Sequence, residues 1–456
     1  MSRGKAAPGT RRRDGAADRS HAARASRSAR RAMPARVGPT LLDLNAQLLH
    51  EVLRFDAPAD AVVSAFLRSH RQLGPRERHV LAETTYAVLR RKSLLQHLAP
   101  SGPGALERRL AALAWAGDEA ALRAGLDNQE QHWLDAVRAI DVAALPDKLR
   151  HNLPDWVAQP LRERLGDAEF WSLAASLDAP APLDLRVNTL KTDRASVLVA
   201  LREAGVTAQP TPWSPWGIRI DGKPALQRWP VFTSGQVEVQ DEGSQLLALL
   251  VDAKRGEMVV DFCAGAGGKT LALGAAMRNT GRLYAFDTSG HRLAALKPRL
   301  ARSGLSNVYA AQLAHERDDR VKRLAGKIDR VLVDAPCTGL GTLRRNPDLK
   351  WRQSPESVQE LQGRQQAILD SAARLLKPGG RLVYATCSLL AAENEAVAQA
   401  FSECRRDFDP VQADAALQAA HVSDVAPLTE GPYLRLWPHR HATDGFFAAV
   451  WMRRPA

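Results

Sequence analysis

The sequence predicts an α/β protein with a doubly wound parallel sheet in its C-terminal half, preceded by an all-helical segment and a small mixed segment. Beyond about residue 240, short buried apolar runs alternate with amphipathic helical stretches, which is the pattern of successive βα units. Residues 40–140 instead carry apolar side chains near a 3.6-residue period. Residues 141–230 combine frequent prolines with two alternating runs, which indicates short strands between helices.

Residues 1–38 are predicted to be a disordered basic tail. Residues 1–36 hold eleven Lys and Arg against Asp14 and Asp18, so they carry +9 of the formal net charge of +13. Large apolar residues are almost absent there, and such a segment cannot offset its ordering entropy by burial. We interpret the tail as an arm whose basic side chains contact nucleic-acid phosphates. A solubilising extension, a mistaken start codon and a transit peptide remain alternatives.

Residues 39–140 are predicted to form a helical domain. The leucines between Leu41 and Val52 fit one amphipathic helix, and Arg76–Leu95 fit a second, with Gly74-Pro75 as the break between them. The second helix carries a cluster of arginines that faces either RNA or solvent. Residues 141–235 are predicted to be a small α+β module with strands at Leu183–Val187 and Gly217–Ile220.

Residues 236–454 contain the alternating pattern of the predicted sheet. Helices are expected from Lys269, up to Ser303-Gly304, and at Glu356–Leu376, where Lys377-Pro-Gly-Gly380 ends the last one. A parallel, doubly wound sheet binds its ligands at the carboxyl ends of its strands. The expected strands are 258–262, 282–286, 307–311, 329–334, 381–385 and 446–451.

Composition excludes several classes of protein. The chain has 456 residues, 45% hydrophobic and 25% charged, which excludes collagen-like, mucin-like and wholly disordered proteins. No apolar run approaches the ~20 residues of a membrane span, and no secretory leader is recognisable. Four cysteines without CxxC or zinc spacing predict neither a disulfide scaffold nor a metal site. We therefore expect a cytoplasmic protein with reduced thiols.

A glycine-rich loop follows the first strand of the predicted sheet, in Asp261-Phe-Cys-Ala-Gly-Ala-Gly-Gly-Lys-Thr270. The P-loop pattern fails because Cys263 stands at its first glycine, and the dinucleotide fingerprint fails because Thr270 stands at its third. Asp287 ends the next strand, twenty residues after Gly267, where an acid can accept hydrogen bonds from ribose hydroxyls. The loop therefore favours an adenosyl ligand without phosphates. A purely structural β-turn-α loop is the alternative.

Two cysteines follow two strands of the predicted sheet. Asp334-Ala-Pro-Cys337 ends the fourth strand and Ala385-Thr-Cys-Ser388 ends the fifth, so both thiols are expected at the ligand-binding edge. Buried packing is the alternative interpretation, and it suits Cys404 and Cys263 better. A thiolate that adds to carbon 6 of a pyrimidine makes carbon 5 nucleophilic towards a methyl sulfonium. A carboxyl group such as that of Asp334 at the ring edge would stabilise the resulting charge.

These motifs together resemble the RsmB-like (Sun/Fmu) family of RNA cytosine-5 methyltransferases over most of residues 40–453. The resemblance implies a Rossmann-like class I methyltransferase sheet, S-adenosyl-L-methionine as cofactor, and RNA as partner, with 16S-type ribosomal RNA as the expected substrate. The motifs that carry it are Val239–Gln245, Asp261–Thr270, Asp287–Arg292, Asp334–Gly339 with Arg344–Arg352, Ala385–Ser388 with Glu393–Glu395, and His441–Phe447.

By the same resemblance, Cys387 forms the covalent adduct with carbon 6 of cytosine and Cys337 promotes product release. Asp334 would line the catalytic pocket, and Lys269 would lie near the reacting base or be an ordinary helix lysine. DNA cytosine-5 methyltransferases instead use the cysteine that corresponds to Cys337, so the reverse assignment stays open. The expected cofactor contacts are Cys263, Ala264, Gly265, Ala266, Gly267, Gly268, Lys269, Asp287, Arg292 and Asp334.

The resemblance also implies RNA-binding parts outside the sheet. Leu73–His79 and Val88–Arg91 resemble a NusB-like helical domain, and Arg186–Lys191 resembles the family's small RNA-contacting module. Trp351 is expected either to stack on a base or to pack in the core. The residues expected to contact RNA are Arg186, Asn188, Lys191, Arg344, Arg345, Lys350 and Arg352.

One family feature is missing. An acid usually follows the third strand beside the adenine, but the chain reads Ala311-Gln-Leu-Ala-His-Glu316, where Gln312 or His315 would have to replace it. Because this acid is missing, a non-catalytic RNA-binding or ribosome-assembly factor stays an alternative to an enzyme. A transfer-RNA substrate and a DNA methyltransferase are further alternatives. We expect the protein to act as a monomer.

Overall fold

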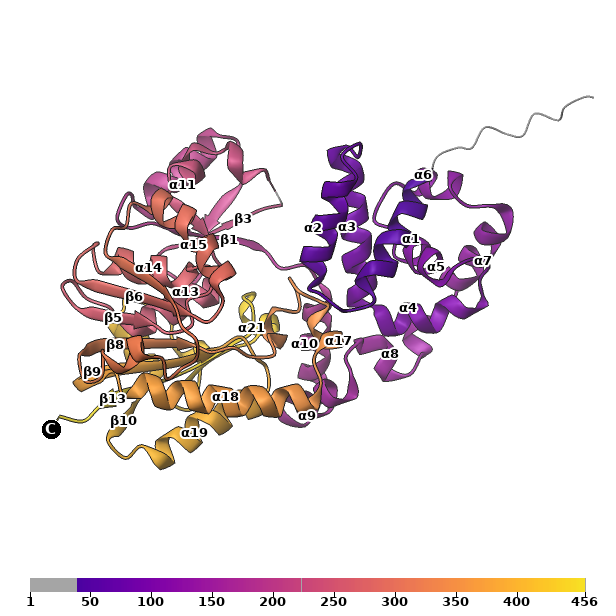
Figure 1. Cartoon of the computed structure of the whole chain (residues 1–456). Coiled ribbons are helices and arrows are strands. Elements are labelled where there is room, and N and C mark those ends of the chain that lie inside the picture. The colour runs from indigo at the N-terminus through magenta and orange to yellow at the C-terminus, as the bar shows by residue number, and fades with distance from the viewer. Residues whose placement is uncertain (1–38, 223, 456) are drawn as a thin grey trace, which may run out of the picture. The chain divides into compact units, whose positions relative to one another are not determined.

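The computed structural model describes residues 39–222 and 224–455 of the chain (Figure 1). The predicted basic tail, residues 1–38, lies outside the described residues. From Leu41 onward the chain forms one compact unit. None of the helices in the described part of the chain combines the length and the apolar character that a membrane crossing requires.

The first part of this unit is helical, as predicted. The expected single helix at 76–95 is divided, because Arg91 leaves the helical conformation (φ −111°, ψ 26°) between α3 and α4. Two apolar clusters, one around Leu49 and Leu110 and one around Leu48 and Leu81, hold these helices together. The helices are α1 (Leu41–Val52), α2 (Ala59–Ser69), α3 (Pro75–Arg90), α4 (Lys92–Leu98), α5 (Leu106–Leu113), α6 (Glu119–Ala124), α7 (Asn128–Arg138), α8 (Asp147–His151), α9 (Asp155–Leu165) and α10 (Asp167–Asp178), with short 3-10 turns η1 (Ala99–Ser101) and η2 (Val142–Ala144).

A four-stranded antiparallel sheet follows, in the order β2-β3-β1-β4. Both predicted strands of this segment are confirmed, and alternate side chains such as Leu185, Ile218 and Val237 pack into one buried cluster. Its elements are β1 (Leu183–Val187), α11 (Arg194–Glu203), β2 (Ala208–Pro210), β3 (Gly217–Ile220), η3 (Leu226–Arg228), α12 (Pro230–Thr233) and β4 (Val237–Val239).

The C-terminal part contains a nine-stranded sheet with helices on its faces (Figure 1). Eight strands run in the order β11-β12-β13-β9-β8-β5-β6-β7, and β10 pairs with β13. Its elements are α13 (Glu242–Val251), β5 (Met258–Asp261), α14 (Gly268–Ala276), β6 (Arg282–Asp287), α15 (Gly290–Ser303), β7 (Val308–Gln312), α16 (Asp319–Lys322), β8 (Ile328–Asp334), η4 (Leu340–Thr342), α17 (Leu349–Arg352), α18 (Pro355–Ala373), β9 (Leu376–Thr386), η5 (Ala391–Glu393), α19 (Glu395–Cys404), β10 (Phe408–Val411), α20 (Ala413–Ala419), η6 (Ala426–Leu428), β11 (Thr429–Glu430), β12 (Tyr433–Leu436), α21 (Pro438–His441) and β13 (Phe446–Arg453).

The prediction of a parallel sheet is correct for five strands and wrong for the others. β5 to β9 pair in parallel. β13 lies antiparallel to β9, and β10, β11 and β12 are joined to β13 or to one another by antiparallel pairs, so the sheet is mixed.

The boundary after the long helix also differs. α18 ends at Ala373, and residues 377–380 already belong to β9. Pairing of Leu376 with Ile328 of β8 starts β9 before this proline–glycine segment, which is therefore included in the strand.

Candidate active site

The carboxyl ends of four adjacent parallel strands carry the predicted site. β6, β5, β8 and β9 lie side by side, and the segments that follow them contain Asp287, the glycine loop, Cys337 and Cys387. Because parallel strands end at one edge of a sheet, residues more than a hundred positions apart in sequence meet there. The structure thus brings together the catalytic residues that the motifs predicted.

The loop from Asp261 to Gly268 is shaped by hydrogen bonds to two carboxylates. Gly265 N donates to Asp287 Oδ2 (2.8 Å), and Thr270 Oγ1 donates to Asp261 Oδ2 (2.7 Å). Gly267 has a φ of 84°, and a Cβ there would lie 2.0 Å from the Leu296 side chain. Only glycine fits that position, because it tolerates the left-handed conformation and the close packing of α15.

This loop offers the features that an adenosyl ligand needs. Asp287 is 8% exposed, and its Oδ1 accepts a hydrogen bond from Ser289 N (2.7 Å). A Cβ on Gly265 would meet no atom within 4 Å, so open space adjoins the loop. Asp261 Oδ1 is buried without a hydrogen-bond partner, and burial raises the pKa of Asp261 to about 7. Arg292 lies exposed on α15, where its backbone N–H donates to Ser289 Oγ (3.3 Å).

Lys269 and Asp334 form an ion pair between the glycine loop and the end of β8. Lys269 Nζ lies 2.7 Å from Asp334 Oδ2, with the lysine side chain 11% exposed and the aspartate 30% exposed. Burial acts to lower the pKa of Lys269, but the charge and hydrogen bond of Asp334 outweigh it and raise that pKa. The ammonium therefore stays charged and fixes the carboxylate beside the two cysteines.

The two strand-end thiols are in contact. Cys337 Sγ and Cys387 Sγ lie 3.4 Å apart, and both side chains are partly buried. The hydrogen bond to Cys387, followed by burial, raises the pKa of Cys337 well above its ordinary value. Cys337 therefore keeps its proton, and its thiol lies where it can donate to the Cys387 sulfur. A thiolate is the nucleophilic form of cysteine, so this arrangement favours Cys387 as nucleophile.

The remaining cysteines lie outside this pair. Cys263 follows β5, and burial raises its pKa well above the ordinary value, which keeps it a neutral thiol beside the cofactor loop. Cys404 ends α19 and is exposed. Within the described residues, no group of three or more His, Cys, Asp or Glu side chains is arranged to hold a metal ion.

Three residues expected to contact RNA bind other parts of the protein instead. Arg186 is 2% exposed and donates to Gln240 Oε1 and Gly268 O, both at 2.7 Å. Asn188 is also buried and donates to Gly235 O and Ser303 O. Lys191 Nζ donates to Ser234 O and Arg302 O. Arg186 ties the four-stranded sheet to the start of α14, next to the glycine loop, whereas Asn188 and Lys191 tie it to the end of α15.

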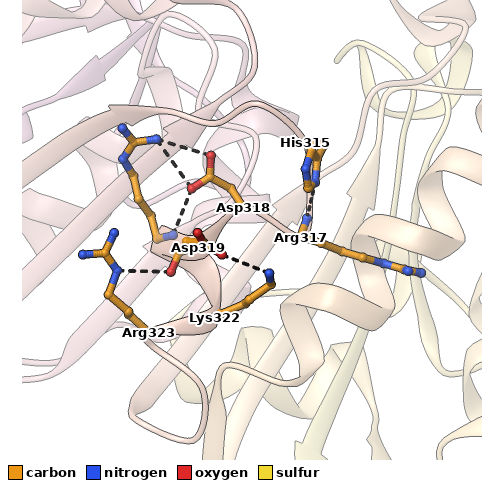
Figure 2. Close-up of a pocket in the computed structure, with 7 residues that line it drawn as sticks. His315, Arg317, Asp318, Asp319, Lys322 and Arg323 are labelled. Atoms are coloured by element: carbon orange, nitrogen blue, oxygen red, sulfur yellow. Dashed lines mark hydrogen bonds and ion pairs between the residues drawn. The ribbon is translucent and has the colours of Figure 1, made fainter.

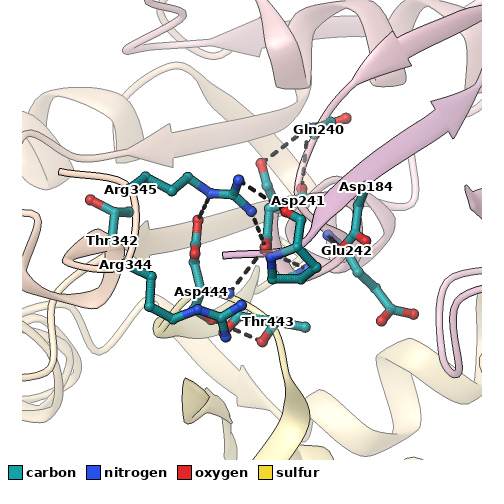
Figure 3. Close-up of polar contacts among 12 residues, drawn as sticks. Asp184, Gln240, Asp241, Glu242, Thr342, Arg344, Arg345, Thr443 and Asp444 are labelled. Atoms are coloured by element: carbon teal, nitrogen blue, oxygen red, sulfur yellow. Dashed lines mark hydrogen bonds and ion pairs between the residues drawn. The ribbon is translucent and has the colours of Figure 1, made fainter. Parts of the chain in front are cut away.

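Arg344 and Arg345 also form hydrogen bonds and ion pairs within the protein (Figure 3). Arg345 bridges two carboxylates, with Nε 2.6 Å from Asp444 Oδ2 and Nη2 3.0 Å from Asp241 Oδ2. Arg344 is 5% exposed and donates to Thr443 O (3.2 Å). Sequence analysis assigned no role to Asp241 or Asp444. Both lie within family motifs, but nothing in one sequence tells which arginine each carboxylate meets.

The segment that contains α17 docks on the helical part of the chain. Lys350 is 3% exposed, Nζ donates to Arg90 O (2.7 Å), and burial lowers the pKa of Lys350 to about 7. Trp351 Nε1 donates to Leu89 O (2.7 Å), so both side chains cap the last carbonyls of α3. Direct phosphate contact from Lys350 is therefore wrong for this structure. Arg352 instead pairs with Asp348 (3.4 Å).

The end of β7 and the loop that follows it contain Gln312 and His315, the two residues considered as replacements for the family's acid. Gln312 Nε2 donates to Thr288 O (3.0 Å), and His315 Nδ1 accepts from Arg317 N (3.1 Å). Asp318 folds back to accept from Ala314 N (3.1 Å). The loop and α16 form a charged surface pocket (Figure 2), whose lining is His315, Arg317, Asp318, Asp319, Arg320, Lys322 and Arg323.

Comparisons with known proteins agree with this geometry. The family profile described as 16S rRNA methyltransferase RsmB/F matches residues 248–452, and a profile described as the RsmF/B-like ferredoxin-like domain matches residues 153–227. A probable ribosomal RNA small subunit methyltransferase B of Synechocystis is 33% identical over 439 residues, which cover 88% of this chain and 97% of the relative.

Further relatives and solved structures give the same picture. Ribosomal RNA small subunit methyltransferase F of Escherichia coli is 35% identical over 310 residues, 65% of this chain and 62% of the relative. The crystal structure of the protein PH0851 superposes with a TM-score of 0.74 at 27% identity, covering 91% of this chain and 99% of that one. A methyltransferase homologue from Pyrococcus horikoshii gives a TM-score of 0.58 at 29% identity, over 69% of this chain and all of the homologue.

Proposed function

Because this chain belongs to the RsmB/F family of 16S rRNA methyltransferases, we propose that it methylates carbon 5 of a cytosine in small-subunit ribosomal RNA, with S-adenosyl-L-methionine as the methyl donor. The observation that carries the proposal is the pair of thiols 3.4 Å apart beside the ion pair of Lys269 and Asp334. An enzyme that only methylates a ring nitrogen or a ribose oxygen has no use for paired thiols.

The proposed chemistry starts at Cys387. Its thiolate adds to carbon 6 of the cytosine, and the electrons gained by the ring make carbon 5 nucleophilic. Asp334 lies at the ring's N3/amino edge and stabilises the charge that develops there, held in place by Lys269. After methylation, a water molecule takes the proton of carbon 5, the electrons of that C–H bond re-form the double bond between carbons 5 and 6, and Cys387 leaves as a thiolate. The thiol of Cys337, in contact with Cys387, supports this departure by its hydrogen bond.

The cofactor site in this proposal is the glycine loop with Asp287. The bound cofactor supplies an electrophilic methyl group. Residues 263–269 would surround it, and Asp287 would accept hydrogen bonds from the ribose hydroxyls, for which each carboxylate oxygen has a lone pair free beside its one backbone donor. The buried, unpartnered Asp261 Oδ1 is a further acceptor near this loop.

We propose that the chain divides into a helical domain at 39–140, a small RNA-contacting module at 141–235 and the methyltransferase domain at 236–454. The target cytosine must leave its stack to reach the pair of thiols, so a single-stranded or splayed nucleotide is the expected target. The enzyme would act as a monomer in the cytoplasm.

Transfer of a labelled methyl group tests the proposed function. Purified protein with labelled S-adenosyl-L-methionine should methylate unmodified 16S rRNA or small subunits, and bisulfite mapping should place the label on one cytosine. Transfer RNA and DNA of matched concentration should remain unlabelled. Label in transfer RNA, in DNA or on another base would contradict the proposal.

Cofactor binding depends on Asp287 in a way that calorimetry can measure. Asp287→Asn should weaken S-adenosyl-L-methionine binding roughly 10- to 100-fold, because hydrogen bonds to a charged group contribute about 1.5–3 kcal/mol. The exposed Asp370 on α18 provides the control, since Asp370→Asn should bind the cofactor like the unchanged protein. Failure of the unchanged protein itself to bind would favour a non-catalytic assembly factor.

A further inference from the structure

A buried carboxylate connects the two turns that carry the thiols. Glu393 Oε1 accepts from Thr338 N (2.8 Å), and Glu393 Oε2 accepts from Thr338 Oγ1 and Ser388 Oγ, both at 2.5 Å. Thr338 immediately follows Cys337, and Ser388 immediately follows Cys387. The Glu393 side chain is fully buried. One carboxylate therefore holds the residues next to both cysteines.

The turn that carries Glu393 is itself fixed. Tyr384 OH donates to Glu393 O (2.6 Å), and Asn394 Nδ2 donates to Ser388 O (3.0 Å). Gln365 on α18 donates from the same Nε2 to Glu393 Oε1 (3.1 Å) and to Pro336 O (2.9 Å). The carboxylate is thus bound from α18 and from both cysteine turns, and Tyr384 of β9 holds the backbone of the same residue, which leaves it little freedom.

This carboxylate has donors but no cation among its partners in the described part of the chain. Its neighbours within hydrogen-bond distance are two hydroxyls, one backbone N–H and one side-chain amide. An ionised carboxylate only accepts hydrogen bonds, and these four donors match that requirement. Burial of a charge is costly, so a packed apolar residue would stabilise this position more simply. A charge retained here points to a role in the chemistry of the adjacent thiols.

We propose that Glu393 is a positioning residue that holds Cys337 and Cys387 in contact and whose charge keeps the proton of the pair on Cys337. The proposal deepens the proposed function and rests on its assignment of Cys387 as nucleophile. The charge of Glu393 adds to the hydrogen bond of Cys387 and to burial in raising the pKa of Cys337. From the opposite side, the charge of Lys269 interacts with Cys387.

The titratable groups around Cys337 indicate that the charge of Glu393 acts directly on this thiol. Tyr384 of β9 is a further titratable group near Cys337, and burial raises the pKa of Tyr384 well above its ordinary value, so it stays neutral. Asp334 pairs with Lys269 across the site. Glu393 is therefore the charge next to Cys337 that a single substitution can remove.

Alkylation of the full-length protein tests the inference without RNA or cofactor. Glu393→Gln keeps the shape but removes the charge, which makes loss of the proton from Cys337 easier. With iodoacetamide and peptide mass spectrometry, the midpoint pH for Cys337 alkylation should fall. At a fixed pH near 8, the ratio of Cys387 to Cys337 labelling should fall at least threefold. Glu395→Gln is the matched control, because Glu395 pairs with Arg164 (2.9 Å) and touches neither thiol turn; it should leave the ratio unchanged.

A second variant separates position from charge. Ser388→Ala removes one donor and keeps Glu393 charged, so Cys337 should retain its alkylation midpoint. Capture of the thiol pair by phenylarsine oxide, which needs two adjacent sulfurs, should weaken at least threefold. Unchanged capture, or an unchanged labelling ratio in folded Glu393→Gln, would overturn the inference. These readouts do not depend on methylation, so failure of the proposed function shows only in the labelled-methyl assay.

Discussion

Cys387→Ala should reduce methyl transfer to RNA to background, a loss of roughly a thousandfold or more. Without a sulfur that adds to carbon 6, carbon 5 of cytosine stays too electron-poor to attack the methyl group. The protein should remain folded, because Gly341 N still donates to the backbone carbonyl of residue 387 and single substitutions of this kind change stability by about 1 kcal/mol. Labelled-methyl transfer measures the activity, and thermal unfolding measures the fold.

The exposed Cys404 provides the control for this experiment. Cys404→Ala lies on α19, away from the pair of thiols, and should methylate at the unchanged rate. Residual methylation by Cys387→Ala within tenfold of the unchanged protein would show that Cys387 is not the nucleophile. If Cys337→Ala were then inactive, the thiols would have the reverse roles.

The sheet was predictable where its strands are buried on both faces. β5, β6 and β8 read as short apolar runs between turn signals, and helices cover both of their faces. β10, β11 and β12 contain two to four residues each and alternate weakly, so no pattern reveals them. The direction of β13 was not predictable either, since periodicity reports which faces are buried and not which way a strand runs.

The clustering of the candidate site residues was predictable for a related reason. The motifs of the glycine loop and of the two cysteines lie at strand ends, and the topology of the sheet then places them together without knowledge of side-chain packing. The contact between Lys269 and Asp334 follows from the same placement. The role proposed for Glu393, which concerns the position of the proton in the thiol pair, depends on hydrogen-bond geometry and could not be predicted from the sequence.

The expected RNA contacts show where sequence analysis fails. Lys350 and Arg344 resemble a basic surface patch, but the structure buries both, with backbone carbonyls as partners. The partner of Lys350 lies 260 residues away, in α3. A backbone carbonyl is present at every position, so no pattern in the sequence marks which one a lysine will meet.

Cys337→Ala should trap a covalent complex between the protein and its RNA. In the unchanged protein, the Cys337 thiol lies 3.4 Å from Cys387 Sγ, where it can donate to the thiolate that leaves carbon 6 and so stabilise it. Without that donor, the addition of Cys387 still takes place, but its departure slows, and the adduct accumulates. A band that migrates slowly on a denaturing gel and disappears after ribonuclease treatment should appear only with the substrate RNA and the methyl donor present.

The double substitution of Cys337 and Cys387 by alanine should remove this band, because the sulfur that forms the bond is then absent. A band from Cys387→Ala but not from Cys337→Ala would assign bond formation to Cys337. The two sulfurs lie in contact, so distance alone does not distinguish them. The distinction rests on the proton: the hydrogen bond with Cys387, burial and the charge of Glu393 raise the pKa of Cys337, and a protonated thiol is a poor nucleophile but a good donor to a departing thiolate.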